Sequence, residues 1–167
     1  MLIVKRRPLL IRTLRKVFYF CAQPMQKTYW YIFRPYRPGA KTFIFYHDKL
    51  LLVRIGYAHK KWVLPGGGIE RWEESAQAAV REAKEESGVV IDSPIYVNER
   101  SYNNQYKKVT VFYYTDTTPS DDIVIDGQEV IDAGWFDLTS LPDNHASRLD
   151  EEIVMYNKWR ADNKDLT

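Results

Sequence analysis

The fold is decided by residues 67–89, which read GGIERWEESAQAAVREAKEESGV. Four small apolar side chains recur there at helical spacing and share one stripe of a helix: Ala76, Ala79, Val80 and Ala83. Gly88 follows them, and glycine commonly ends a helix. The stretch therefore predicts a glycine-rich loop and then a helix over residues 73–87, whose small side chains pack against a sheet.

The same helix would carry three glutamates on a second face. Glu82, Glu85 and Glu86 stand at positions i, i+3 and i+4, where like charges repel by roughly 0.2–0.5 kcal/mol per pair. Mg²⁺ is a hard ion that takes carboxylate oxygens and bridges to substrate phosphates, so it would offset this repulsion. The alternative is a solvated acidic face on a surface helix. Because glycines flank the helix and one face is apolar, we favour a metal site.

Apolar runs on both sides of this stretch predict the sheet. Two of them flank His47 and Asp48, which is a hairpin signal. The expected strands cover residues 41–46, 49–55, 62–64, 89–100, 106–116 and 130–136. Residues 146–160 space their apolar side chains at helical intervals and predict a terminal helix. Together these elements predict an α/β fold.

Length and composition restrict the class of protein. The 167 residues fit a single domain, and 45% apolar with 28% charged residues is ordinary for a globular protein, which excludes wholesale disorder. No apolar run approaches the roughly 20 residues that cross a bilayer. The single cysteine, Cys21, cannot close an intramolecular disulfide or by itself build a zinc site. With no secretion signal at the start, we expect a cytoplasmic location.

The charge is distributed unevenly. Residues 1–41 carry ten Lys and Arg side chains and no Asp or Glu, whereas the remainder carries 14 basic and 22 acidic ones. Residues 9–22 also predict a short basic amphipathic helix. The alternatives for this arm are packing on the acidic body or on a second copy in a homodimer, and contact with nucleic acid or an anionic membrane. We expect packing, because the aromatic run at residues 29–33 is too hydrophobic for a solvated tail.

Residues 67–89 resemble the Nudix box at all of its positions, with Ala83 where the family more often has a larger aliphatic residue. The flanks at residues 62–68 and 129–142 are also similar to those of Nudix hydrolases. The resemblance implies an α/β/α sandwich with a mixed β-sheet. It implies a Nudix hydrolase domain over residues 40–167, with residues 1–39 as a basic N-terminal helix or extension.

The resemblance also implies roles for individual residues. The family's divalent ions are bound by acidic residues that correspond to Glu82, Glu85 and Glu86, and by a backbone carbonyl that corresponds to Gly66. The residue at Glu82 can serve as the base for the attacking water or orient it. Glu73 and Arg81 are expected to hold the loop and helix together. Glu129 is our choice for a further carboxylate that completes the catalytic set, with Asp132 as the second choice.

The implied activity is hydrolysis of a phosphoanhydride bond in a nucleoside diphosphate linked to another group, with Mg²⁺ as cofactor and Mn²⁺ as an alternative. The alternative function is a Nudix-fold module that binds a nucleotide or RNA without significant turnover. For a nucleotide-like substrate, the stacking candidates are residues 102–106 together with Tyr57, His59 and Trp62. Trp72 stands where the family more often has Gly, which questions the conformation of the loop.

Overall fold

The computed structural model describes residues 2–4, 36–56, 60–103, 108–125, 127 and 129–164. The predicted helix over residues 9–22, Cys21 and the aromatic run at residues 29–33 lie outside the described residues. So do the stacking candidates Tyr57 and His59 and the loop residues 104–107. Neither helix in the described part of the chain is long and apolar enough to cross a membrane.

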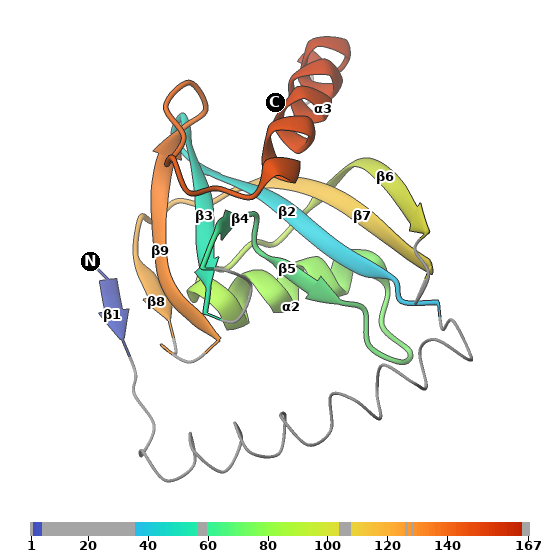
Figure 1. Cartoon of the computed structure of the whole chain (residues 1–167), viewed down its shortest axis with the longest axis horizontal. Coiled ribbons are helices and arrows are strands. Elements are labelled where there is room, and N and C mark those ends of the chain that lie inside the picture. Colours follow the sequence, from blue (N-terminus) through green and yellow to red (C-terminus); the bar gives the residue numbers. More distant parts are fainter. Residues whose placement is uncertain are drawn as a thin grey trace, which may run out of the picture.

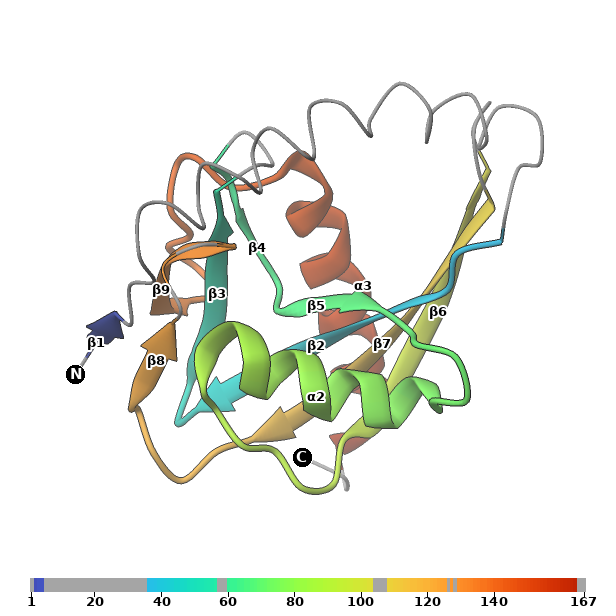
Figure 2. The ribbon, with the colours of Figure 1, turned by 90° about the horizontal axis from the view of Figure 1, so that it is seen from below.

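Two helices lie on opposite sides of one mixed sheet, with α2 (Ser75–Ser87) below the strands and α3 (Ser147–Asp162) above them in Figure 1. Seen from below, α2 stands in front of the strands and α3 behind them (Figure 2). Among the described residues the sheet has seven strands. They are β2 (Gly39–Tyr46), β3 (Lys49–Ile55), β4 (Trp62–Val63), β5 (Gly66–Gly68), β6 (Ile95–Asn103), β7 (Lys108–Thr117) and β9 (Val130–Asp137). The predicted α/β/α sandwich is confirmed.

The central strand β2 connects the two layers of the core. It pairs antiparallel with β3 and parallel with β7, which makes the sheet mixed. Its side chains alternate between the two faces, as a strand requires. Phe43 and Phe45 pack with residues of α3, whereas Ile44 packs in the cluster that contains Ala83 of α2. Both faces of β2 are therefore covered by helices.

Helix α2 follows the prediction closely. It begins at Ser75, two residues later than predicted, and ends before Gly88, whose left-handed φ of 72° lets its N–H donate to the Lys84 carbonyl. Ala79 and Ala83 are buried, and Ala76 and Val80 are partly buried against the core. The stripe also includes one side chain that the prediction omitted, the buried Ala78.

The predicted strand over residues 89–100 is wrong in its first part, because the strand β6 begins only at Ile95. Val89 and Ile91 are buried while Val90 is exposed, so an irregular segment imitates the alternation of a strand. Pro94 stands directly before β6 and has no N–H to pair with a neighbour.

Three strands lie outside the predicted set. Strand β5 consists of three glycines that we expected to form a loop, and it pairs with β2 through its backbone alone. Strands β1 (Leu2–Val4) and β8 (Ile123–Ile125) pair in parallel as a separate small sheet. The first residues of the chain thus join the body, and β8 contacts α2.

Candidate active site

The glycines of β5 bring the backbone close to its neighbours. Gly66 has a φ of 150°, and a Cβ at this position would overlap the Ala40 carbonyl and the backbone of Lys41. A Cβ on Gly67 would overlap the carboxylate of Glu82. Only glycine permits this approach, so the loop and the glutamates of α2 are in direct contact.

Glu86 is a buried carboxylate bound to the same loop. Its Oε2 accepts a hydrogen bond of 2.8 Å from the N–H of Gly66. The pKa of Glu86 is raised to about 8, first by burial and then by the charges of Glu82 and Glu129, which together outweigh the lowering effects of the Gly66 N–H and of the Lys41 ammonium. A divalent cation would relieve the cost of ionising this group.

Arg81 ties the loop to the helix. Its Nε and Nη2 donate to the two oxygens of Glu73 at 2.8 and 3.0 Å, and Nη2 also donates to the carbonyl of Gly68 at 2.9 Å. This bidentate pair lowers the pKa of Glu73 and raises that of Arg81. The expected holding contact between Glu73 and Arg81 is present.

The remaining Arg81 nitrogen, Nη1, donates to Glu82 at 2.8 Å and to Glu85 at 3.1 Å. Burial raises the pKa of Glu82 despite the opposing effect of Arg81, and the charges of Glu85 and Glu129 raise it further. The Glu85 side chain is 61% exposed. The three glutamates therefore share one side of α2 but differ in burial and in partners.

The two candidates for a further carboxylate lie in different surroundings. Glu129 lies close enough to Glu82 and Glu86 for its charge to raise the pKa values of both. Asp132 instead accepts a hydrogen bond of 2.8 Å from Arg54, which also lies over the ring of Trp62. Of the two, Glu129 is the one that the structure brings toward the cluster.

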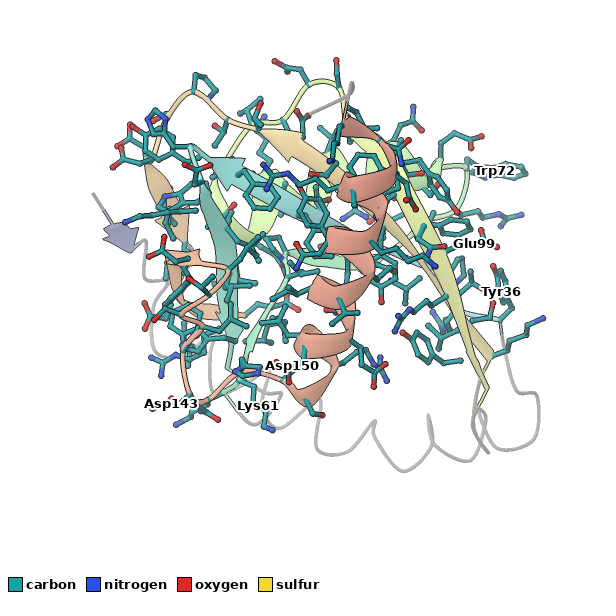
Figure 3. The ribbon with its side chains drawn as sticks, turned by 90° about the horizontal axis from the view of Figure 1, so that it is seen from above. Tyr36, Lys61, Trp72, Glu99, Asp143 and Asp150 are labelled. Atoms are coloured by element: carbon teal, nitrogen blue, oxygen red, sulfur yellow. The ribbon has the colours of Figure 1, made fainter. Side chains whose placement is uncertain are left out.

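Trp72 retains the backbone that a glycine would adopt. Its φ is 72°, its side chain is 89% exposed, and the Arg71 guanidinium lies 5.0 Å from its ring centre. It projects outward from the molecule (Figure 3). Trp72 thus adopts a left-handed conformation that costs an L-residue about 1–2 kcal/mol.

Two of the stacking candidates are in the described residues and both already pack on neighbours. The ring of Trp62 lies 4.8 Å from that of Phe136 in an edge contact. Tyr102 lies under the Arg148 guanidinium, 4.2 Å from it, and its hydroxyl is 3.4 Å from that of Tyr113. Both rings lie on the α3 side of the sheet.

The donor set suits a hard divalent ion. Carboxylate oxygens of α2 and the backbone of Gly66 lie together, and burial, followed by the charges of neighbouring carboxylates, raises the pKa values of Glu82 and Glu86. Within the described ranges, however, no three His, Cys, Asp or Glu side chains already stand as a metal-ligating group. The carboxylates of Glu82 and Glu85 both accept hydrogen bonds from Arg81 instead.

Sequence reasoning missed a polar group on the other side of the sheet. Lys41 of β2 donates to Glu152 of α3 at 2.8 Å, and the hydroxyl of Tyr113 donates to the same oxygen at 3.0 Å. The available signal was Glu152 itself, which follows the buried Leu149 by three residues and is therefore a charge on the core face of a helix.

The glycine loop, the clamping Arg81 and the glutamates of α2 are arranged as the resemblance to Nudix hydrolases implies, and comparison with known proteins points to the same family. A model of the NUDIX domain matches residues 35–155. The chain belongs to the Nudix hydrolase family, as residues 67–89 predict.

Two curated relatives illustrate the similarity in sequence. Nudix hydrolase 8 of Arabidopsis thaliana is 32% identical over 111 residues, which are 63% of this chain and 30% of the relative. Diphosphoinositol polyphosphate phosphohydrolase 3-beta of Bos taurus is 33% identical over 93 residues, which are 53% of this chain and 55% of the relative. The chain spans less than two thirds of the length of either relative.

Solved structures share the fold at low sequence identity. The MutT NUDIX hydrolase from Burkholderia pseudomallei has a TM-score of 0.65 at 21% identity, over 72% of this chain and 98% of that one. The NUDIX domain of Shewanella oneidensis NrtR, solved in complex with ADP ribose, has a TM-score of 0.64 at 23% identity, over 76% and 90% of the two chains.

Proposed function

We propose that the protein is a hydrolase that cleaves a phosphoanhydride bond in a nucleoside diphosphate linked to another group, with Mg²⁺ or alternatively Mn²⁺ as cofactor. One observation carries the proposal. The buried Glu86 is bound to the N–H of Gly66, and Glu82 lies against Gly67. Carboxylates that gather at a glycine loop are costly for stability, and a cation bridging to phosphate offsets that cost.

Under this proposal, Glu82, Glu85, Glu86 and the carbonyl of Gly66 hold the cation. Glu85 leaves its contact with Arg81 to do so. When bound, the ion neutralises the phosphate oxygens and increases the acidity of the attacking water. Its binding is the reason for the cluster of like charges on α2.

The chain's own residues then position and deprotonate the water. Glu82 or Glu129 accepts the proton on a carboxylate oxygen, for which the raised pKa of Glu82 is suited. Arg81 acts through position, because it clamps Glu73 and the Gly68 carbonyl and so holds the loop on the helix. Asp132 stays the second choice for this role, because its carboxylate is paired with Arg54 and its charge is not among the causes that raise the pKa values of Glu82 and Glu86.

The substrate class rests on the family resemblance and on a structural relative that was solved with ADP ribose. A second class is favoured by several relatives whose names state that they act on diphosphoinositol polyphosphates. Both classes contain a phosphoanhydride bond, so both belong in one test.

The test is a hydrolysis screen with the full chain and Mg²⁺, with products identified by mass. The panel contains nucleoside triphosphates, nucleoside diphosphate sugars, dinucleotides, capped RNA and a diphosphoinositol polyphosphate. We expect cleavage within a diphosphate, dependent on the metal and lost with chelator. Cleavage of only the inositol compound would replace the nucleotide class by the second class.

The alternative function is a binding module without turnover. In that case the panel would give no cleavage, while equilibrium dialysis would show binding of a nucleotide or RNA. The intact set of Arg81, Glu82, Glu85 and Glu86 favours turnover, because a binding module has no need to keep these charges together.

A further inference from the structure

An ion pair between Lys41 of β2 and Glu152 of α3 lies on the side of the sheet opposite to the glutamates of α2. Glu152 is 1% exposed, and its Oε1 accepts from both Lys41 and Tyr113. The Lys41 side chain is itself only 21% exposed. A buried ion pair contributes little net stability relative to apolar side chains of similar volume, because both charges lose their hydration. Stability alone therefore does not account for it.

The position of Lys41 in the sheet suggests another role. Lys41 is paired directly with Gly66 between β2 and β5, and with Tyr113 between β2 and β7. A Cβ on Gly66 would stand 2.9 Å from the Cγ of Lys41. The Ala40 carbonyl and the Lys41 Cα lie closer still, so the backbone of β2 and the first part of the Lys41 side chain together fill the space beside Gly66.

Gly66 completes a chain of contacts from one helix to the other. Its N–H donates to Glu86 of α2 at 2.8 Å. Contacts therefore run from Glu152 on α3 through Lys41 to Gly66 and on to Glu86. A neighbouring bond from the N–H of Thr42 to the Pro65 carbonyl, at 3.0 Å, holds the same loop to β2.

We propose that Glu152 is a positioning residue, which fixes the Lys41 side chain beside Gly66 and thereby orients the Gly66 peptide toward Glu86. This inference rests on the proposed function, in which the Gly66 carbonyl and Glu86 hold the cation. The lysine side chain has many rotamers, and the bond to Glu152 confines it to one orientation. The ion pair thus fixes the orientation of the Gly66 peptide at the proposed metal site.

The experiment compares Glu152→Gln with a neighbouring control on the same helix, Glu151→Gln. Glu151 is exposed and pairs with Arg100 at 3.0 Å, far from the loop in sequence and without contact to Lys41. The first readout is Mn²⁺ binding to the substrate-free protein, measured by electron paramagnetic resonance. The second is the rate as a function of Mg²⁺ concentration, with the substrate that the wild type cleaves best.

We expect Glu152→Gln to weaken Mn²⁺ binding about 10-fold and to raise the Mg²⁺ requirement similarly, because partners of a metal ligand commonly have effects of this size. Glu151→Gln should match the wild type in both. Wild-type affinity in Glu152→Gln would overturn the inference and leave the proposed function intact. Absence of Mn²⁺ binding in the wild type would overturn both.

A double variant separates positioning from stability. Lys41→Met with Glu152→Met removes both charges and keeps the side-chain volume, so most of the melting temperature lost in Glu152→Gln should be regained, less the cost of the Tyr113 hydroxyl that loses its acceptor. Mn²⁺ affinity should stay low, because the link to α3 is absent. Recovery of affinity together with melting temperature would show that the pair acts through stability alone, and would overturn the inference even if Glu152→Gln does not fold.

Discussion

Glu85 and Glu86 are adjacent in the chain, but the fold places them in different environments. Glu86 is buried against Gly66, whereas the Glu85 side chain is largely exposed. As metal ligands, both should be needed for turnover, and their effects on stability should differ.

We predict that Glu86→Gln and Glu85→Gln each lower kcat by about 100-fold or more, because even the outer partners of a metal ligand have effects of about 10- to 100-fold. In metal-free buffer at pH 8.5, only Glu86→Gln should raise the melting temperature. The glutamine keeps the acceptor for the Gly66 N–H and removes a buried charge. Near-normal kcat in both variants at saturating Mg²⁺ would show that the cluster is not the catalytic centre.

The metal-free protein should lose stability as the pH rises through neutrality. The pKa of Glu86 is raised from 4.5 to about 8, so between these values the folded state holds a proton that the unfolded state has released. Stability is then complete below the unfolded pKa and falls by up to about 1.4 kcal/mol per pH unit as pH rises. Glu82, whose pKa is also raised, acts in the same direction.

Glu73 changes the stability in the opposite direction with pH, because its pKa is lowered and its contribution to stability is lost only in acid. Urea unfolding in chelator from pH 5 to 9 should therefore show the highest free energy of unfolding on the acid side of neutrality. Glu86→Gln should reduce the decline of the free energy of unfolding with rising pH. Mg²⁺ should reverse that decline by binding the folded state. A free energy that rises from pH 6 to 8.5 would contradict the prediction.

At the level of single residues, functional groups formed by residues close in sequence can be predicted, whereas groups formed by residues far apart in sequence cannot. The glutamates of α2 could be found because their spacing on a helix brings them together. Lys41 and Glu152 are separated by 111 positions, and no local pattern connects them. Trp72 shows a third case, in which its residue type disfavours the backbone conformation that the surrounding loop imposes.

At the level of elements, the helices and the long strands could be predicted because their side chains alternate or recur with a clear period. Strand β5 could not, because its three glycines have no side chains to pattern and its pairing with β2 depends on the backbone alone. Strand β8 has only three residues, too few for a period to be read.

The end of α2 allows a test of the left-handed residue that terminates it. We predict that Gly88→Ala lowers the free energy of unfolding by about 1–2 kcal/mol or more, because φ is 72° and a Cβ would stand 2.9 Å from the Cβ of Val124 on β8. The melting temperature should fall by about 2–4 °C per kcal/mol. Gly68→Ala is the matched control for stability, since a Cβ there meets nothing within 4 Å. Equal melting temperatures for both variants would contradict the prediction.

At the scale of the whole molecule, the charge is uneven, because residues 1–41 are basic and free of Asp and Glu whereas the remainder has an excess of acidic groups. The first residues pair as β1 with β8, which in turn contacts α2. The beginning of the chain is therefore attached to the body close to the helix that carries the glutamates.

We predict that deletion of residues 1–24 lowers the melting temperature or changes the oligomeric state. It removes the pairing of β1 with β8 and the apolar residues within 9–22, and each large side chain that is buried contributes roughly 1.5–3 kcal/mol. Calorimetry and light scattering measure the two outcomes. A truncated chain with unchanged stability and mass, but without salt-sensitive binding to RNA or anionic vesicles, would show that the arm binds a partner.

The parallel pairing of β2 with β7 has a consequence for biosynthesis. Gly39 pairs with Val111 and Phe45 with Thr117, so this contact closes a long loop, and contacts of that kind slow folding. During translation, at about 5–20 residues per second, β2 and α2 leave the ribosome several seconds before β7 and α3. The nascent chain thus presents the face of β2 that carries Phe43 and Phe45 to chaperones before α3, which covers that face, has been made.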